Sequence, residues 1–298
     1  MRCGIQSWWG GARPTPSAVR VDSSPTLGVQ VGRTLRDVLV VLLVAPAVGV
    51  ILVVAAQLVS DRLVIERLLD GQRTYDVSTV DYPASGYGNY VDKYSECAAF
   101  TIGVLEPTAQ NALQSAIRSY LPSLGCAPLN SVLTGNESAT PVTPGAWYFR
   151  YWHGYTIITR PGLLFTTIGG VRAIVGLLLI ASTVRLVMFV RRWFGSLAAT
   201  ALFAPLLLAT EFVDLPESIP HALTFAAALA SVDLGVRYFA RDMSGRRAIV
   251  ASLAAGTAVQ FFDILIVAPV AWSLTVCLMG AVTFASTGSY WRGLRMAA

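Results

Sequence analysis

The sequence predicts an all-α polytopic membrane protein: a bundle of about six spanning helices, with a small α-rich extracytoplasmic insert between the first two spans. Hydrophobic residues fill 54% of the 298 positions and charged residues only 13%, a balance too apolar for a soluble protein of this length. Several uncharged apolar runs approach or exceed the ~18 residues that a membrane-crossing helix needs. The charges between these runs also differ in sign between the two sides of the predicted membrane.

The first 60 residues are predicted to form a tail followed by a membrane-spanning helix. Residues 1–37 are predicted to be a disordered cytoplasmic tail, because Gly, Pro and Ser are frequent and no hydrophobic period is present. The first span is predicted at 38–60, where residues 38–59 carry no charge and are long enough to cross ~30 Å of hydrocarbon. That run starts too late and is too long for a signal peptide.

The polar residues 61–160 form the predicted extracytoplasmic insert. The opening DRLVIERLLDGQR has apolar residues at helical spacing, so an amphipathic helix is expected to continue the first span. A second helix is predicted from Pro107 to about Leu121, because Pro is favourable in the first turn of a helix. The insert is large enough for a small cap and too small for an independent enzyme domain.

Residues 161–298 are predicted to form a membrane bundle of five helices, at about 173–190, 194–212, 218–236, 247–262 and 265–286. With six spans, one side of the membrane carries 14 Lys and Arg against 4 acidic residues, and the other side carries 8 against 13. The positive-inside rule then predicts that both termini are cytoplasmic and that the insert faces outward. The Arg-rich composition, with Lys93 as the only lysine, suggests a GC-rich bacterial genome, so the predicted location is the cytoplasmic membrane of a bacterium.

The cysteines agree with this orientation. Cys97 and Cys126 both fall in the outward-facing insert, where a disulfide can persist, and we predict that they are paired. Cys3 and Cys277 are expected to be free thiols. A metal site is the alternative for the insert pair, but the chain contains no CxxC spacing or paired His that would support one. The sequence identifies no cofactor.

Candidate chemistry concentrates on the outer side. The candidate catalytic residues are the outer carboxylates and one His, since a carboxylate can act as a general base: Asp81, Asp92, Glu96, His153, Asp214 and Asp263. Glu217 and His221 stand close to Asp214 in the sequence. The candidate ligand-binding residues lie within an aromatic segment at 147–155 or follow it: Arg150, Trp152, Arg160 and Arg172. The guanidinium forks of the three Arg residues suit a phosphate.

A structural explanation competes with each of these assignments. Acids and Arg at a membrane surface are commonly solvated or paired at helix ends. The aromatic segment is equally typical of an interfacial belt, in which Trp and Tyr lie between headgroups and hydrocarbon. A nucleic-acid surface is excluded, because the Arg residues stand at the ends of the predicted spans and form no continuous patch.

Two function classes follow, and the sequence leaves enzyme status open. In the first, a membrane-embedded transferase acts on a lipid-linked, anionic envelope precursor at the outer face. In the alternative, a non-catalytic envelope protein uses its outer cap to bind a partner or a lipid. A transporter is third, because the predicted span interiors hold few of the ionisable groups that ion paths need.

The outer segments also carry a resemblance. The pattern DY…NYVDKYSEC followed by RYWHGY…RP, over about residues 60–175, resembles bacterial multispan membrane proteins for which no activity is known. The chain is similar to membrane glycosyltransferases of the GT-C type in one respect, an acidic residue in the first outer loop. That similarity of layout implies the transferase class.

Overall fold

The computed structural model describes residues 27–74, 78, 80–83, 92–102, 111–121, 126, 129, 146–148, 153–208, 211–239, 245–262, 273, 275–277 and 280. Within these ranges the chain is helical apart from one two-stranded antiparallel ribbon, so the predicted helical class is confirmed in outline. Two described helices are long and apolar enough to cross a membrane, over Val31–Gln57 and Ile168–Arg192.

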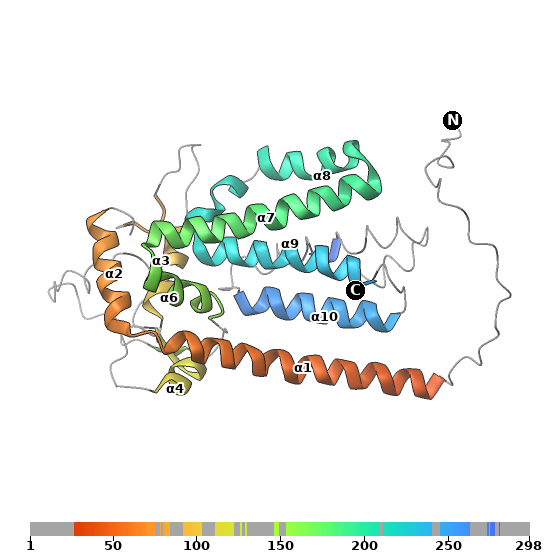
Figure 1. Cartoon of the computed structure of the whole chain (residues 1–298), viewed down its shortest axis with the longest axis horizontal. Helices are drawn as coiled ribbons and strands as arrows, with labels where there is room; N and C mark the ends of the chain where they lie inside the picture. The colour runs from red at the N-terminus through yellow and green to blue at the C-terminus, as the bar shows by residue number, and fades with distance from the viewer. Residues whose placement is uncertain are drawn as a thin grey trace.

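Five helices form a bundle along the long axis of the molecule (Figure 1). They are α1 (Leu27–Gln57), α7 (Ile168–Phe194), α8 (Ser196–Leu208), α9 (Ile219–Phe239) and α10 (Gly245–Phe262). Helix α9 packs against both α7 and α10. Its alanine-rich sequence contributes small buried residues such as Ala222 and Ala228, and small residues let neighbouring helix backbones approach closely.

The remaining elements form a cap at one end of the bundle (Figure 1). The cap consists of α2 (Asp61–Arg73), α3 (Lys93–Thr101), α4 (Ala112–Ile117), α6 (Thr156–Phe165) and the ribbon of β1 (Ser119–Leu121) and β2 (Ala146–Tyr148). In the ribbon, Tyr120 pairs with Trp147. Two 3-10 turns, η1 (Glu211–Val213) and η2 (Leu215–Glu217), lead from α8 into α9.

Contacts at the cap end show where the bundle helices begin and end. Pro216 in η2 lies against Gly176 in the third turn of α7, so α7 and α9 both begin at the cap end. Helix α10 finishes there, because the Phe261 carbonyl accepts a hydrogen bond of 3.0 Å from Gly154 N in the cap. A Cβ on Gly154 would overlap Phe261, so this close approach depends on glycine.

The first predicted span differs from the structure at both of its ends. Helix α1 begins at Leu27, inside the predicted tail, because apolar residues such as Val31 and Leu35 extend the helical run before the uncharged segment. It ends at Gln57, and α2 starts as a separate helix at Asp61. The amphipathic helix is therefore present, but it is turned across the bundle rather than continuous with the first span (Figure 1).

Two further helices differ from prediction in length. Helix α8 has 13 residues, about 20 Å at the helical rise, where a full span over 194–212 was expected. Beyond α8, the chain reaches the start of α7 through the segment that holds η1 and η2. The helix predicted from Pro107 to Leu121 is shorter: α4 starts after the Asn111 cap, and 119–121 form a strand instead. The predicted sixth span, 265–286, lies outside the described residues except at 273, 275–277 and 280.

The predicted disulfide is confirmed: Cys97 and Cys126 are joined, 29 residues apart in sequence. Both cysteine side chains are buried, Cys97 within α3 and Cys126 completely. Cys277 is a free, exposed thiol. The bridge therefore ties α3 to Cys126, 29 residues further along the chain.

Replacing Cys97 and Cys126 together by Ser should lower the free energy of unfolding by about 3–4 kcal/mol, because the reduced chain regains the entropy of a loop of this length. Denaturant unfolding of the purified protein in detergent would measure the loss. Cys277→Ser is the matched control and should leave the unfolding midpoint unchanged. Equal midpoints for all three proteins, or alkylation of Cys97 without reductant, would show that the bridge does not support the cap.

Candidate functional site

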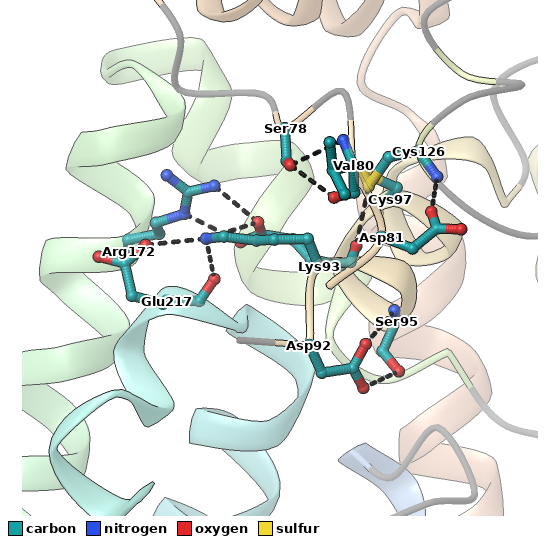
Figure 2. The surroundings of a disulfide bond; sticks show 11 residues. Ser78, Val80, Asp81, Asp92, Lys93, Ser95, Cys97, Cys126, Arg172 and Glu217 are labelled. Atoms are coloured by element: carbon teal, nitrogen blue, oxygen red, sulfur yellow. Dashed lines mark hydrogen bonds and ion pairs between the residues drawn. A yellow bond between two sulfur atoms is a disulfide. The ribbon is translucent and has the colours of Figure 1, made fainter. Parts of the chain in front are cut away.

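Helix α3 supplies the centre of the candidate site (Figure 2). Asp92 caps its N-terminus: the carboxylate accepts hydrogen bonds from Ser95 N at 3.0 Å and from Ser95 Oγ at 2.7 Å. Such a cap satisfies an amide donor that the first turn would otherwise leave unpaired. The helix is buried on nearly all sides from Lys93 to Phe100. One of its faces carries two charged residues together with the disulfide, at helical spacing: Lys93, Glu96, Cys97 and Phe100.

Glu96 and Arg172 form a two-point ion pair between the cap and the bundle. Arg172 Nε lies 3.0 Å from Glu96 Oε1, and Arg172 Nη2 lies 2.6 Å from Glu96 Oε2. The Glu96 side chain is only 2% exposed. A buried carboxylate requires such a two-point partner, because removing one member of a buried pair costs roughly 3–5 kcal/mol.

Lys93 completes a cluster of four charges. Its Nζ lies 2.8 Å from Glu217 Oε2 and 3.4 Å from Glu96 Oε2, and it also donates to the Glu217 carbonyl. Figure 2 shows Lys93 reaching from α3 toward Arg172 and Glu217. The four side chains carry two positive and two negative charges, so the cluster is neutral and joins three segments: α3, α7 and η2. We refer to Lys93, Glu96, Arg172 and Glu217 as the cap latch.

The latch sets the acidity of Glu217. The hydrogen bond from Lys93 holds the pKa of this carboxyl below its usual value, against an opposing effect of partial burial; the charges of Lys93 and Arg172 act in the same direction as the hydrogen bond. A carboxylate with a lowered pKa is a weak base at neutral pH, whereas a general base works best with a pKa near the operating pH. Glu217 is therefore better suited to holding a cation than to accepting a substrate proton.

A second group of contacts surrounds Asp92 and Asp81. His221 Nε2, on α9, lies 3.4 Å from Asp92 Oδ2. The Asp81 carboxylate accepts from Cys126 N at 2.6 Å, and its carbonyl accepts from the backbone amides of Lys93 and Tyr94. Asp81 thus connects Cys126 to the first residues of α3, the helix that carries the other disulfide cysteine.

The rings of Tyr82 and Tyr94 stack beside these carboxylates, 6.2 Å apart. Desolvation is the main reason why the pKa of both phenols is raised, and for Tyr82 the charges of Asp92 and Asp81 raise it further. Both side chains therefore remain neutral hydroxyl groups at physiological pH. The Tyr82 side chain is exposed, so the stack presents an aromatic surface to the outside of the cap.

Arg160 lies apart from the cap latch, at the junction of α1 and α2. Its guanidinium donates to the Val59 carbonyl at 3.2 Å and to Asp61 Oδ1 at 2.8 Å. The side chain is 3% exposed. The carbonyl belongs to the break between the two helices and the carboxylate to the first turn of α2, so these contacts stabilise the bend.

His153 occupies a strained turn before α6. Its φ is 52°, a left-handed conformation that is uncommon for residues other than Gly, although His adopts it more often than most. Its carbonyl accepts from Thr156 Oγ1 at 2.7 Å, and its Nδ1 lies 3.1 Å from the Tyr155 hydroxyl. The side chain is buried, so these contacts orient the turn that meets α10.

The structure thus brings together part of the predicted site. Four predicted residues meet at the α3 end of the cap: Asp81, Asp92, Glu96 and Arg172. Arg160 and His153 lie in other contacts, and Asp214 lies in the turn between η1 and η2. Arg150, Trp152 and Asp263 lie outside the described residues. The described residues contain no group of three His, Cys, Asp or Glu side chains that could hold a metal ion.

Two members of the cap latch, Lys93 and Glu217, were not among the predicted site residues. A signal for Lys93 exists in the sequence: it is the single lysine of an Arg-rich chain, and it stands three and four residues before Glu96 and Cys97. These positions share one helical face. Glu217 stands in the acidic segment near Asp214 that the sequence analysis named, but its pairing with Lys93 has no local signal, because the two residues are 124 positions apart.

The lowered pKa of Glu217 predicts a dependence of stability on pH. A folded-state pKa below the unfolded value contributes stability above about pH 4.3, the ordinary glutamate pKa, and this stability is lost as the pH falls through the folded value. The thermal midpoint of Glu217→Gln should therefore lie below that of the wild type at pH 7. The difference should narrow as the pH is lowered toward 3.

Glu66→Gln provides the control. Glu66 is as exposed as Glu217 but pairs with the exposed Arg62, and exposed pairs contribute little. Its thermal midpoint should follow that of the wild type at every pH. A wild-type advantage over Glu217→Gln that stays constant from pH 7 to pH 3 would show that the ionised carboxylate does not stabilise the latch.

Comparison with known proteins adds no assignment to this geometry. No protein-family model, no characterised protein and no solved structure matches the chain. Inferences about function therefore rest on the contacts of these residues.

Proposed function

We propose that the chain is a six-span integral protein of a bacterial cytoplasmic membrane, with cytoplasmic termini and an outward-facing cap. The directions of the helices support this topology: α7 and α9 begin at the cap end, whereas α10 ends there, so the cap contacts of Arg172, His221 and Phe261 all lie at one end of the bundle. The two predicted sides of the membrane then correspond to the two ends of the bundle. The sixth span is the segment predicted at 265–286.

The surface of the bundle supports a lipid environment. Large apolar side chains are exposed on α1 between Val31 and Leu52 and on the outer face of α7, including Leu43, Ile51, Leu177 and Met188. Soluble monomers rarely expose continuous apolar patches above a few hundred Å². In a bilayer the same side chains contact acyl chains, and their exposure has no cost.

We further propose that the cap is a non-catalytic binding platform, which recognises a protein or lipid of the cell envelope. The neutrality of the cap latch carries this proposal. Each latch carboxylate faces a cation at 2.8 Å or less, so a phosphate could bind only by displacing one of them. Asp81 and Asp92 are likewise engaged with backbone and side-chain donors. The aromatic stack of Tyr82 and Tyr94 provides an exposed surface for recognition.

One observation favours a transferase as the second candidate. The Asp214 carboxylate, half-buried in the turn between η1 and η2, has no side-chain hydrogen bond or ion pair to any described residue. It lies three residues before Glu217, at the same end of the bundle as the latch. A carboxylate in this position is available for proton transfer at the membrane surface.

The topology predicts the accessibility of introduced thiols. In a Cys3→Ser, Cys277→Ser background, a membrane-impermeant maleimide should label a Tyr82→Cys variant in intact cells. A Ser196→Cys variant, at the exposed turn between α7 and α8, should react only after the membrane is opened. Equal labelling of both variants in intact cells would refute the six-span topology.

A comparison of point mutants should separate the binding platform from the transferase. In the platform reading, Asp214→Asn keeps normal protein abundance and normal levels of lipid-linked envelope precursors, because the side chain supports no described contact. Glu96→Gln should lower abundance, since it leaves Arg172 without its charged partner. Immunoblotting of membranes and mass spectrometry of lipid extracts would measure the two quantities.

The deletion strain sets the reference for this experiment. If the deletion and Asp214→Asn both accumulate the same lipid-linked precursor, while Asp214→Asn protein remains abundant, the transferase reading is correct and the platform reading is wrong. Precursor accumulation in Glu96→Gln that merely follows the loss of protein supports a structural role for Glu96.

A further inference from the structure

Three charged residues meet at the end of the bundle opposite the cap. Asp233 of α9 accepts from two Arg residues: Arg185 Nη2 of α7 lies 2.9 Å from Asp233 Oδ2, and Arg237 Nε lies 2.7 Å from Asp233 Oδ1. Arg185 Nε makes a further hydrogen bond of 3.2 Å to the same carboxylate. Unlike the cap latch, this group has a net charge of +1.

The burial of the three side chains is unequal. The Asp233 side chain is 2% exposed, whereas the Arg185 and Arg237 side chains are 55% and 48% exposed. Among the described residues, Arg185 Nη1 and both Nη atoms of Arg237 have no hydrogen-bond acceptor. The buried carboxylate therefore fixes two guanidinium groups and leaves their outer nitrogen atoms available to a ligand.

The position along α7 puts this group at the inner edge of the hydrocarbon. Arg185 lies six residues before Arg191 in the last turns of the helix, a rise of about 9 Å. On the proposed topology, Arg191 and Arg192 lie at cytoplasmic headgroup level, so Arg185 lies just within the inner leaflet. A net positive charge in this low-dielectric region strongly favours a nearby anion.

The surroundings of the two Arg residues suit a phospholipid. On α7, Val184 and Met188 share the exposed face of Arg185, and on α9 the exposed Leu234 stands one turn before Arg237. These side chains can contact acyl chains. The guanidinium carbon of Arg237 lies 5.7 Å from the centre of the buried Phe189 ring. This cation–π contact further restricts the orientation of the Arg237 side chain.

We propose that Arg185 and Arg237, positioned by Asp233, bind the phosphate of an anionic phospholipid in the inner leaflet. Planar guanidinium forks match phosphate oxygens at two points, and the cytoplasmic leaflet is the anionic one. The leaflet assignment rests on the proposed topology; the site itself does not. A simple clamp between α7 and α9 would need one Arg for one Asp, and the second Arg supplies the charge that a lipid neutralises.

Native mass spectrometry of the purified full-length protein tests this proposal. Phosphatidylglycerol should bind more tightly than phosphatidylcholine with the same acyl chains. An Arg185→Gln, Arg237→Gln double variant should lose this preference, with about tenfold weaker binding of phosphatidylglycerol, as expected for charge-assisted hydrogen bonds. Arg62→Gln, which changes an exposed Arg in the cap, is the control and should bind both lipids as the wild type does.

Two further measurements keep the test decisive. Inorganic phosphate should not compete with phosphatidylglycerol; competition at equal phosphate concentration would indicate a site for a free anion and overturn the lipid assignment. If the double variant fails to fold, Arg237→Gln removes the second charge and leaves the pair of Arg185 and Asp233, and it should weaken the preference for phosphatidylglycerol. Unchanged preference in either folded variant would refute the site.

The lipid measurement and the topology measurement can fail independently. Lipid binding is read on purified protein, which has no inside or outside. Labelling of the Ser196→Cys variant in intact cells would reverse the leaflet without removing the site. Equal binding of phosphatidylglycerol and phosphatidylcholine by the wild type would remove the site without changing the topology.

Discussion

The ion pair between Glu96 and Arg172 is the constraint on which the arrangement of the cap depends. A carboxylate that is almost completely buried cannot remain charged without a partner, and the partner lies on a bundle helix. Once this pair forms, the position of α3 relative to α7 is fixed within hydrogen-bond distances. Lys93 then brings η2 and the start of α9 to the same point. The disulfide and the N-capping side chain of Asp92 both act on α3, so they stabilise the helix that the ion pair holds in position.

The two ends of the bundle handle charge in different ways. At the cap end, two cations meet two carboxylates, and the group needs nothing from outside the protein. At the opposite end, two cations share one carboxylate, and both cations keep about half of their side-chain surface exposed. Between these groups, α7 carries no charged residue from Ala173 to Val184. Helix α7 therefore joins a self-contained polar group to one that is completed by its surroundings.

The sequence predicted the elements better than their contacts. Apolar runs located α1, α7, α9 and α10, because a long hydrophobic segment is a local property that the fold does not change. The short α8 was mispredicted, since a run that looks continuous in sequence can end early and return through 3-10 turns. The pairing of Cys97 and Cys126 was predicted correctly, because both cysteines fall in the segment that the topology places outside the cytoplasm. Of the candidate site, the position of Glu96 was found but not its role, because its partner lies 76 residues away, and no periodicity specifies a contact between distant elements.

This distance between partners also changes how the polar residues should be interpreted. In the sequence, Asp81, Asp92 and Glu96 resemble a set of candidate bases, and Arg160 and Arg172 resemble phosphate ligands. In space, each faces a partner within the chain: an amide, a serine, a guanidinium or a carboxylate. Burial explains the difference, since a charged group that is removed from water is costly unless it is paired or hydrogen-bonded within the protein. Charged groups that remain exposed and incompletely neutralised, such as Arg185 and Arg237, can still bind a ligand of opposite charge. The strongest argument for a ligand therefore comes from an imbalance of charge rather than from the number of charged residues.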